Sequence, residues 1–352
     1  MTLILSAMTD RLMSFSDCLL SRQGVHPDQL LSRPMSLGPE HVVVGSLTAV
    51  GLRQKTVQID PQHHVLWAGR EIVASHLIRA LDEAILVDPG TTLATVIAES
   101  ELSAAERASI SLIYHRIDSE AGLLAREFHN CKDTIYLDQK ITFAGTGDFH
   151  FIDDVYPEFP FPANDDSEQL YRAWLPRIAY AFALEAVGHE TINFGYGGWF
   201  ELSRALIGRL EKVPYLIKFW GWNGETLESL PCFSAWYVGH TLCVGRFEFN
   251  QGMETCDAQL TQIPDFLGRE PLPSLDAIAE GFQLAAVQLH VIIEQRGLLY
   301  TSHRPGDWPH FVIDRVNGSL VAHFGPELRD EIEQMMRGNL APIARPYTYP
   351  DI

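Results

Sequence analysis

The stretch Thr2–Ser21, TLILSAMTDRLMSFSDCLLS, contains two apolar-rich runs on either side of the polar pair Thr9 and Asp10. Two such runs around a short polar break predict a β-hairpin. If the loop holds two residues, the numbers of paired residues sum to nineteen, so Thr2 lies opposite Asp17 with Cβ atoms about 5 Å apart. A small second residue also allows Met1 to be removed. Thr2 would then carry a free α-amine beside its own hydroxyl.

A second hairpin follows at residues 53–69. The run RQKTVQI and the run HHVLWAG flank the four-residue turn Asp60–His63, in which Pro61 takes the favoured second position. Closure over this turn pairs Ile59 with His64 and sets Lys55 opposite Ala68. We therefore expect Lys55 and the neighbouring Gly69 to come together.

The rest of the chain alternates between helical and strand character, which predicts an α+β protein rather than a parallel βαβ sheet. Residues 133–147 and 311–324 read as strands, and residues 192–249 are mostly β. Asn317-Gly318 is a strong hairpin signal. Helices are expected over residues 70–85, 103–127, 167–187, 275–295 and 327–337, and Pro176 predicts a kink or a break in the third of them.

Composition excludes several classes of protein. The chain has 352 residues and a formal net charge of −19, with no cluster of Lys and Arg, which argues against nucleic-acid binding. Five cysteines without a CxxC pair favour a reducing compartment. The N-terminal run lacks the features of a signal peptide, and no run is long enough to span a membrane, so we expect a cytoplasmic protein.

Other candidate sites are weaker. A metal site can be imagined from five scattered residues, but their spacing matches no strong motif, so we expect no metal; they are His150, Asp153, Asp154, His189 and Glu190. Cys18 is expected to be a packed thiol, since it points to the strand face opposite Asp17. The aromatic-rich strands after residue 215 are expected to form a core, with a binding surface as the alternative. The GYGG run lacks the Lys-Ser or Lys-Thr of a phosphate loop, so no cofactor is expected.

Several segments in order carry a family resemblance. TLIL, SDCLLS, KTVQIDP, WAGREI and FAGTGDF resemble the successive landmarks of proteasome β-type subunits and bacterial proteasome-like peptidases, which are N-terminal-nucleophile hydrolases. The resemblance covers about Thr2 to Gly198. It implies a four-layer αββα sandwich over residues 1–230, with an insertion at about 20–45. Residues 231–352 would form a C-terminal α/β extension packed on it.

The resemblance also implies roles for five residues. Thr2 would be the nucleophile, Asp17 the acid on the second strand and Lys55 the buried lysine. Gly69 would supply the oxyanion-hole amide, and Thr146 would help to position the α-amine. Three positions depart from the family pattern: Leu19 stands where an arginine is frequent, Asn193 where an acid is usual, and Tyr196 where a serine is usual.

The function implied by the resemblance is a threonine-type hydrolase that cleaves a peptide or other amide bond without a cofactor. A free α-amine has a pKa of about 7.7 to 8.0, so Thr2 could supply both nucleophile and general base. Family members form rings, which makes a homo-oligomer plausible. The alternative is a catalytically inactive protein of the same fold that serves assembly or binding.

Overall fold

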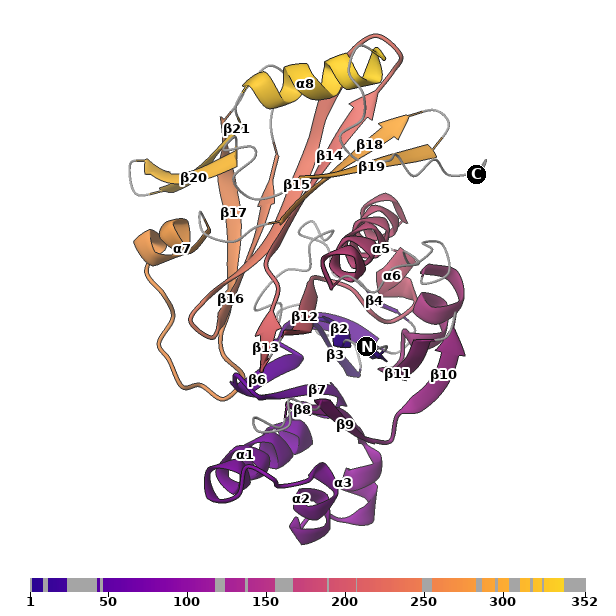
Figure 1. Ribbon diagram of the computed structural model, residues 1–352, viewed down its shortest axis with the longest axis vertical. Coiled ribbons are helices and arrows are strands. Elements are labelled where there is room, and N and C mark those ends of the chain that lie inside the picture. The colour runs from indigo at the N-terminus through magenta and orange to yellow at the C-terminus, as the bar shows by residue number, and fades with distance from the viewer. Residues whose placement is uncertain are drawn as a thin grey trace. The chain divides into compact units, whose positions relative to one another are not determined.

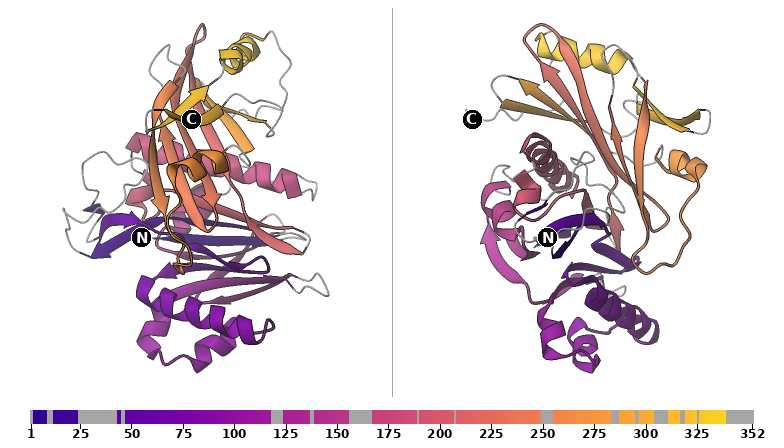
Figure 2. Two further views of the ribbon diagram at one scale, coloured as in Figure 1. Left: turned by 90° about the vertical axis from the view of Figure 1, so that its left-hand side faces the viewer. Right: turned by 180° about the vertical axis from the view of Figure 1, so that it is seen from behind.

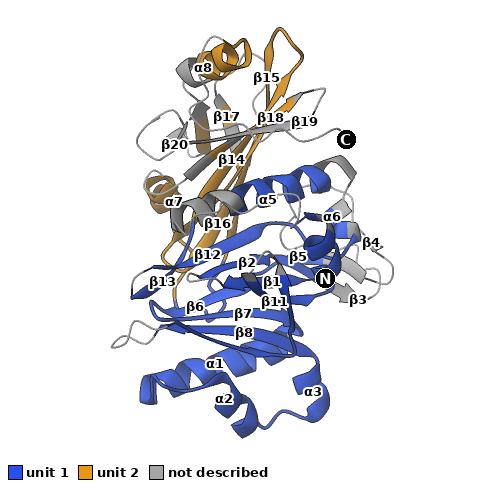
Figure 3. Ribbon diagram, turned by 45° about the vertical axis from the view of Figure 1, so that its right-hand side comes forward, with its two compact units in different colours: residues 1–213, 264–269 blue, residues 214–263, 270–352 orange. Residues whose placement is uncertain are grey.

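The computed structural model describes most of the chain, and its contacts divide that chain into two compact units (Figure 3). Unit 1 comprises Met1–Val213 and Pro264–Arg269, and unit 2 comprises Pro214–Ile263 and Glu270–Ile352. The predicted boundary of folding domains near residue 230 stays a prediction. The described residues are 2–8, 12–23, 43–44, 47–117, 124–136, 139–155, 167–188, 190–206, 208–248, 255–282, 287–294, 297–303, 311–316, 319–324 and 326–338. Most of the predicted insertion lies outside them.

The predicted first hairpin is present, but its register differs from the prediction. Strands β1 (Leu3–Met8) and β2 (Leu12–Asp17) pair antiparallel, with Ile4 opposite Ser16 and Met8 opposite Leu12. Paired numbers therefore sum to twenty, and three residues rather than two separate the strands. The predicted turn residues Thr9 and Asp10 lie outside the described part of the chain.

This hairpin is the centre of a six-stranded sheet, and α5 (Ser167–Gly188) covers one face of it. The sheet order is β10 (Lys132–Tyr136), β11 (Gln139–Gly145), β1, β2, β12 (Phe200–Leu206) and β13 (Arg209–Lys212). The ring of Phe15 stacks on Phe200 at 5.1 Å and on Trp174 of α5 at 5.8 Å between centroids. The helix continues through Pro176 as one element.

A smaller sheet extends from the same part of unit 1. It has three strands in the order β3 (Leu19–Gln23), β5 (Leu47–Leu52) and β4 (Val43–Val44). Since β3 follows β2 after the single residue Cys18, this small sheet continues the chain directly from Asp17.

A four-stranded antiparallel sheet carries the first three helices (Figure 1). Its order is β6 (Thr56–Asp60), β7 (His63–Gly69), β8 (Ile110–Ile117) and β9 (Leu124–His129). The helices are α1 (Glu71–Val87), α2 (Leu93–Glu99) and α3 (Ala104–Ala108). The helix predicted over residues 70–85 is present as α1, and its Val73, Leu77 and Leu81 are buried in one core with Trp67.

The second hairpin also deviates from its predicted register by one residue. Thr56 pairs with Leu66 and Gln58 with His64, and the register then shifts at Ile59 before Asp60 meets His63. This extra residue in β6 is a β-bulge. The Lys55 carbonyl consequently accepts a hydrogen bond from the amide of Trp67 at 3.0 Å, so the predicted pairing of Lys55 with Ala68 is wrong.

The helix predicted over residues 103–127 is mostly wrong. Helix α3 has a capping box, in which Ser103 and Glu106 each bind the other's backbone amide, but it ends at Ala108. The following run ISLIYHRI forms β8, which pairs with β7 on one side and β9 on the other. Its β-branched and aromatic residues suit a buried strand, and pairing with two neighbours outweighs a helical period.

The two larger sheets of unit 1 contact each other face to face (Figure 2). Ile4 and Ala144 of the six-stranded sheet share an apolar cluster with Leu66, Ala68 and Ile113 of the four-stranded sheet. Helices α1 to α3 lie on the other side of the four-stranded sheet.

A polar pair lies within this apolar contact. His115 Nε2 lies 2.9 Å from the Ser6 hydroxyl of the facing sheet, and His115 pairs with His64 of β7. Both histidines are fully buried. Neither ring nitrogen of His64 has a hydrogen-bond partner among the described residues. Burial lowers the pKa of His115 to about 3 and that of His64 well below its usual range.

Unit 2 is an eight-stranded sheet with two helices. Its order is β19 (Gly297–His303), β18 (Val287–Glu294), β14 (Tyr215–Trp222), β15 (Leu227–Val238), β16 (Thr241–Phe247), β17 (Thr255–Ile263), β21 (Ser319–Phe324) and β20 (Phe311–Val316). The helices are α7 (Leu275–Phe282) and α8 (Pro326–Met336). Strands β14 and β18 run parallel, whereas the other pairs are antiparallel.

The aromatic-rich strands form the core of unit 2, as predicted. Trp220, Trp236 and Phe247 are buried, and the ring of Trp236 meets Phe282 of α7 edge-on at 5.0 Å. The helix predicted over residues 275–295 is half wrong, because α7 ends at Phe282 and residues 287–294 form β18 beside β14. Asn317-Gly318 lies outside the described residues. Within the described ranges, no helix is both long and apolar enough to cross a membrane.

The buried histidines predict acid sensitivity of unit 1. Their pKa values are lower in the folded chain than the unfolded value of about 6.5, so protons bind the unfolded chain preferentially. Above about pH 6.5 the contribution of these histidines to the free energy of unfolding is fully present. As the pH drops from there toward the pKa of the folded chain, the free energy of unfolding falls by about 1.4 kcal/mol per pH unit for each histidine. Chemical denaturation at pH 7.5, 6 and 5 measures this slope.

His64→Leu replaces one of these groups by a side chain of similar volume. It should lower the slope of the free energy of unfolding against pH by the contribution of about one proton. The exposed His76 provides the control, since His76→Gln should leave the slope unchanged. An identical slope in His64→Leu and the parent would show that His64 is not held neutral by the fold.

Candidate active site

Thr2 lies directly before β1 and is held by the turn that follows β11. Its nitrogen donates to Thr146 Oγ1 at 2.9 Å, and its carbonyl accepts from the Gly147 amide at 3.2 Å. Thr2 is 8% exposed. Gly145 has φ +126°, and a Cβ there would lie 2.1 Å from the Thr2 carbonyl oxygen, so only glycine permits this close approach.

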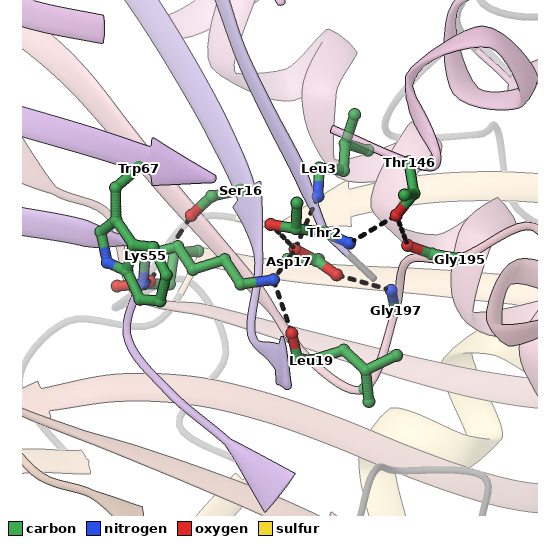
Figure 4. Close-up of polar contacts among 12 residues, drawn as sticks. Thr2, Leu3, Ser16, Asp17, Leu19, Lys55, Trp67, Thr146, Gly195 and Gly197 are labelled. Carbon is green, nitrogen blue, oxygen red and sulfur yellow. Dashed lines mark hydrogen bonds and ion pairs between the residues drawn. The ribbon is translucent and has the colours of Figure 1, made fainter. Parts of the chain in front are cut away.

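The Thr146 hydroxyl has a defined orientation. It donates to the Gly195 carbonyl at 2.9 Å, so its single proton is used there and its lone pairs face the nitrogen of Thr2 (Figure 4). Thr146 is therefore an acceptor toward Thr2. The positioning role that the family resemblance implies for Thr146 stays a prediction.

Asp17, the last residue of β2, is fully buried and connects several elements. Its Oδ1 accepts the amide of Leu3 at 2.8 Å and contacts the Thr2 hydroxyl at 3.5 Å, a long contact. Its Oδ2 accepts the amide of Gly197 at 3.0 Å. The carboxylate thus binds both the start of β1 and the glycine-rich turn of residues 195–198.

Lys55 lies between β5 and β6 and is fully buried. Its ammonium donates to Asp17 Oδ1 at 2.5 Å and to the Leu19 carbonyl at 2.6 Å. Thr2 and Lys55 therefore contact the same oxygen atom of Asp17, as Figure 4 shows. The attraction between opposite charges and the further hydrogen bonds of both groups together oppose the cost of removing them from water.

The glycine-rich turn of residues 195–198 is held from α5. Glu185 Oε2, which is buried, accepts from the Gly198 amide at 3.0 Å and from the Thr191 hydroxyl at 3.1 Å. Gly197 has φ +125°, and a Cβ there would meet Glu185 Oε2 at 2.5 Å. This stretch is a turn after α6 (Glu190–Asn193), not the strand that its sequence suggested.

Tyr196 stands where the family pattern has a serine. Its ring is buried, and its hydroxyl lies 2.9 Å from Nδ1 of His150 in α4 (Asp148–His150), a short helix continued by a π-helical turn at Phe151–Val155. The side chain of Asn193, another of the three departing positions, lies outside the described residues. The Gly195 carbonyl and the Gly197 amide contact Thr146 and Asp17 instead.

The structure thus brings together four of the five predicted site residues, namely Thr2, Asp17, Lys55 and Thr146. Gly69 ends β7, is exposed and pairs with Ile110 of β8. In the part of the chain that the structure describes, no hydrogen bond joins Gly69 to the cluster, so its role stays a prediction.

Sequence reasoning missed the contributions of Glu185, Gly195 and Gly197. The signal available for Glu185 was a charged residue interrupting the apolar run AYAFALEAV. Backbone groups of a turn leave no comparable signal in the sequence.

The neighbouring Cys18 is a packed thiol. It is fully buried, and burial raises its pKa well above the usual range, to which the carboxylates of Glu201 and Asp17 add. Such a thiol is a poor nucleophile.

Of the five residues considered for a metal, His150 and Asp153 are those whose side chains belong to the described part. Among the described residues, no three or more His, Cys, Asp or Glu side chains are grouped so that they could hold a metal ion.

Comparisons with known proteins give no family assignment. No protein-family model matches the chain, and no curated protein matches it. Among solved structures it is similar to eukaryotic HslV from Trypanosoma brucei, with 17% sequence identity over 58% of this chain and 98% of that chain, and a TM-score of 0.32. At this identity and TM-score the likeness identifies no activity for the chain, and the candidate site stands on its own geometry.

Proposed function

We propose that this protein is an N-terminal threonine hydrolase that cleaves a peptide or other amide bond. One observation carries the proposal: the Thr2 hydroxyl and the Lys55 ammonium contact the same buried oxygen of Asp17, while the Thr2 nitrogen contacts Thr146. In this proposal the packed layers of unit 1 are the four-layer αββα sandwich of N-terminal-nucleophile hydrolases. Unit 2 is a C-terminal extension.

The proposed reaction needs Thr2 to be the first residue after removal of Met1. The neutral α-amine takes the proton of the Thr2 hydroxyl while Oγ1 forms a bond to the substrate carbonyl carbon. Collapse of the tetrahedral intermediate breaks the carbon–nitrogen bond, and the leaving amine takes the proton from the α-ammonium. Water then cleaves the ester on Thr2, with the amine again acting as base.

The residues around Thr2 suit this chemistry. A nearby cation favours the neutral, proton-accepting form of an amine, and the Lys55 ammonium is held in place by Asp17 and Leu19. Thr146 accepts a hydrogen bond from the amine of Thr2. The lone pair of that amine therefore stays available for the proton of the Thr2 hydroxyl. We assign the oxyanion to the Gly69 amide, a contribution worth about 3 to 4 kcal/mol in other hydrolases.

The proposal includes a cytoplasmic location and a homo-oligomer, both as expectations from the sequence. The five cysteines are free, which suits a reducing compartment. Light scattering of the purified chain measures its oligomeric state.

The second candidate is a non-catalytic protein of the same fold. The place of Tyr196 favours it, because the hydroxyl that would replace the family serine lies on His150 rather than at Thr2. A retained Met1 would block the amine and decide for this candidate.

The first prediction is that Thr2 carries a free amine. Periodate cleaves the Cα–Cβ bond of an N-terminal threonine only when its amine and hydroxyl are both free, releasing acetaldehyde and ammonia. Mass spectrometry of the N-terminal peptide from untagged protein should show this cleavage. A peptide α′,β′-epoxyketone, which can react with both groups, should label the same residue.

Matched variants distinguish the role of the Thr2 hydroxyl from the removal of Met1. Thr2→Ser should keep both reactions. Thr2→Val has similar shape and also permits removal of Met1, yet it should resist periodate and lower epoxyketone labelling about a thousandfold or more. Met1 retained throughout the population would remove the proposed base and overturn this mechanism.

Thr146 gives a second prediction. Thr146→Val keeps the shape of the side chain but removes the acceptor for the Thr2 nitrogen, whereas Thr146→Ser keeps it. We expect labelling of Thr2 to slow about tenfold in the valine variant, the effect of losing one oriented hydrogen bond, and to stay near the parent rate in the serine variant. Equal rates in both variants would show that the Thr146 hydroxyl does not position the amine.

A further inference from the structure

A second buried ion pair lies beside the Lys55–Asp17 pair. Glu201 of β12 is 1% exposed and lies opposite Ser16 of β2, one residue from the Phe200 that faces Asp17. Its Oε1 accepts from the Lys212 ammonium of β13 at 3.1 Å. Lys212 also donates to the side-chain oxygen of Gln54 at 2.5 Å, directly before Lys55 in the chain.

The other oxygen of Glu201 binds the backbone at Lys55. Glu201 Oε2 accepts the amide of Lys55 at 2.6 Å and the amide of Thr56 at 2.9 Å. The Ser16 hydroxyl supports the same place, since it lies 2.9 Å from the Thr56 hydroxyl. One carboxylate oxygen therefore holds two consecutive amides at the start of β6.

These two amides need such a partner because of where β6 lies. It is an edge strand of the four-stranded sheet, and Lys55 and Thr56 are fully buried. Buried amides without an acceptor are costly, and β7 lies on one side of β6 only. Glu201 reaches across from the six-stranded sheet and supplies the acceptor.

We propose that Glu201 is a positioning residue that places Lys55, with Lys212 as the cation that orients the carboxylate. The proposal rests on the proposed function in that Lys55 acts on Thr2. Glu201 touches neither Thr2 nor the Lys55 ammonium in the described contacts. It acts by fixing the backbone from which the Lys55 side chain reaches Asp17.

The two oxygens of Glu201 make the proposal testable by one conservative substitution. In Glu201→Gln the amide cannot serve both sides. If its oxygen faces Lys212, its NH₂ group confronts the two backbone amides, donor against donor. In Glu201→Gln/Lys212→Met the cation that attracts the oxygen to the Lys212 side is removed, so the oxygen can accept from Lys55 and Thr56 as the glutamate does.

The closing experiment measures two quantities on each folded variant. The first is acetylation of Lys55 at limiting acetic anhydride, read by peptide mass spectrometry, which reports burial of the ammonium without any catalysis. The second is the rate at which the epoxyketone labels Thr2. Ser203→Ala is the control, since Ser203 lies on the same strand two residues away and contacts Ser14 instead.

In Glu201→Gln we expect Lys55 acetylation to rise about tenfold and Thr2 labelling to fall by a similar factor, the size of an unmade buried hydrogen bond. The double variant should return both to within about twofold of the parent. Ser203→Ala should change neither. A carboxylate with a merely structural role would not give this recovery of Lys55 protection and Thr2 labelling when Lys212 is also replaced.

The proposal is overturned if Lys55 stays protected in folded Glu201→Gln, or if the double variant is no closer to the parent than the single one. Failure of the proposed function looks different. In that case Thr2 resists the epoxyketone in the parent, while the acetylation of Lys55 still reports whether Glu201 places it.

Discussion

The buried ion pair of Lys55 and Asp17 constrains the rest of unit 1. Two charges removed from water are stable only when their remaining hydrogen-bonding atoms are also satisfied. Here that requirement reaches the amides of Leu3 and Gly197 and the carbonyl of Leu19. Loss of one charged partner in such a buried pair costs about 3 to 5 kcal/mol. The start of β1, the end of β2 and the turn after α6 must therefore come together for the core to close.

This constraint explains why Thr2, Asp17 and Lys55 lie together although both predicted hairpin registers are wrong by one residue. The sequence pattern identifies the strands and places Asp17 near Thr2, and the family resemblance adds Lys55. Neither reveals the three-residue connection in the first hairpin or the bulge at Ile59 in the second. One residue along a strand is about 3.3 Å, a distance that an aspartate or lysine side chain can span. Asp17 and Lys55 can therefore make their contacts although the backbone pairing differs by one residue from the predicted register.

Other features could not be read from one sequence for physical reasons. The runs at residues 110–117 and 287–294 are apolar enough to fit a helical period, and pairing with strands distant in the chain makes them β. Glu201 lies in the run FELSRAL, where nothing in its neighbours tells a buried carboxylate from an exposed one. Its partner Lys212 is known only once β13 has paired with β12, and its partner Lys55 only once two sheets have packed.

Asn193 and Tyr196 stand at positions where the family pattern has an acid and a serine. A side-chain hydroxyl and an acid would be lost from the amine's surroundings if the pattern were followed residue by residue. Yet the Gly195 carbonyl accepts from Thr146 and the Gly197 amide donates to Asp17, so backbone groups of this turn hold the two side chains that contact Thr2. A backbone group keeps its place whatever side chain stands beside it, provided that the turn is held, and here Glu185 holds it at Gly198. A departure at the side-chain level is therefore compatible with an intact polar environment for Thr2.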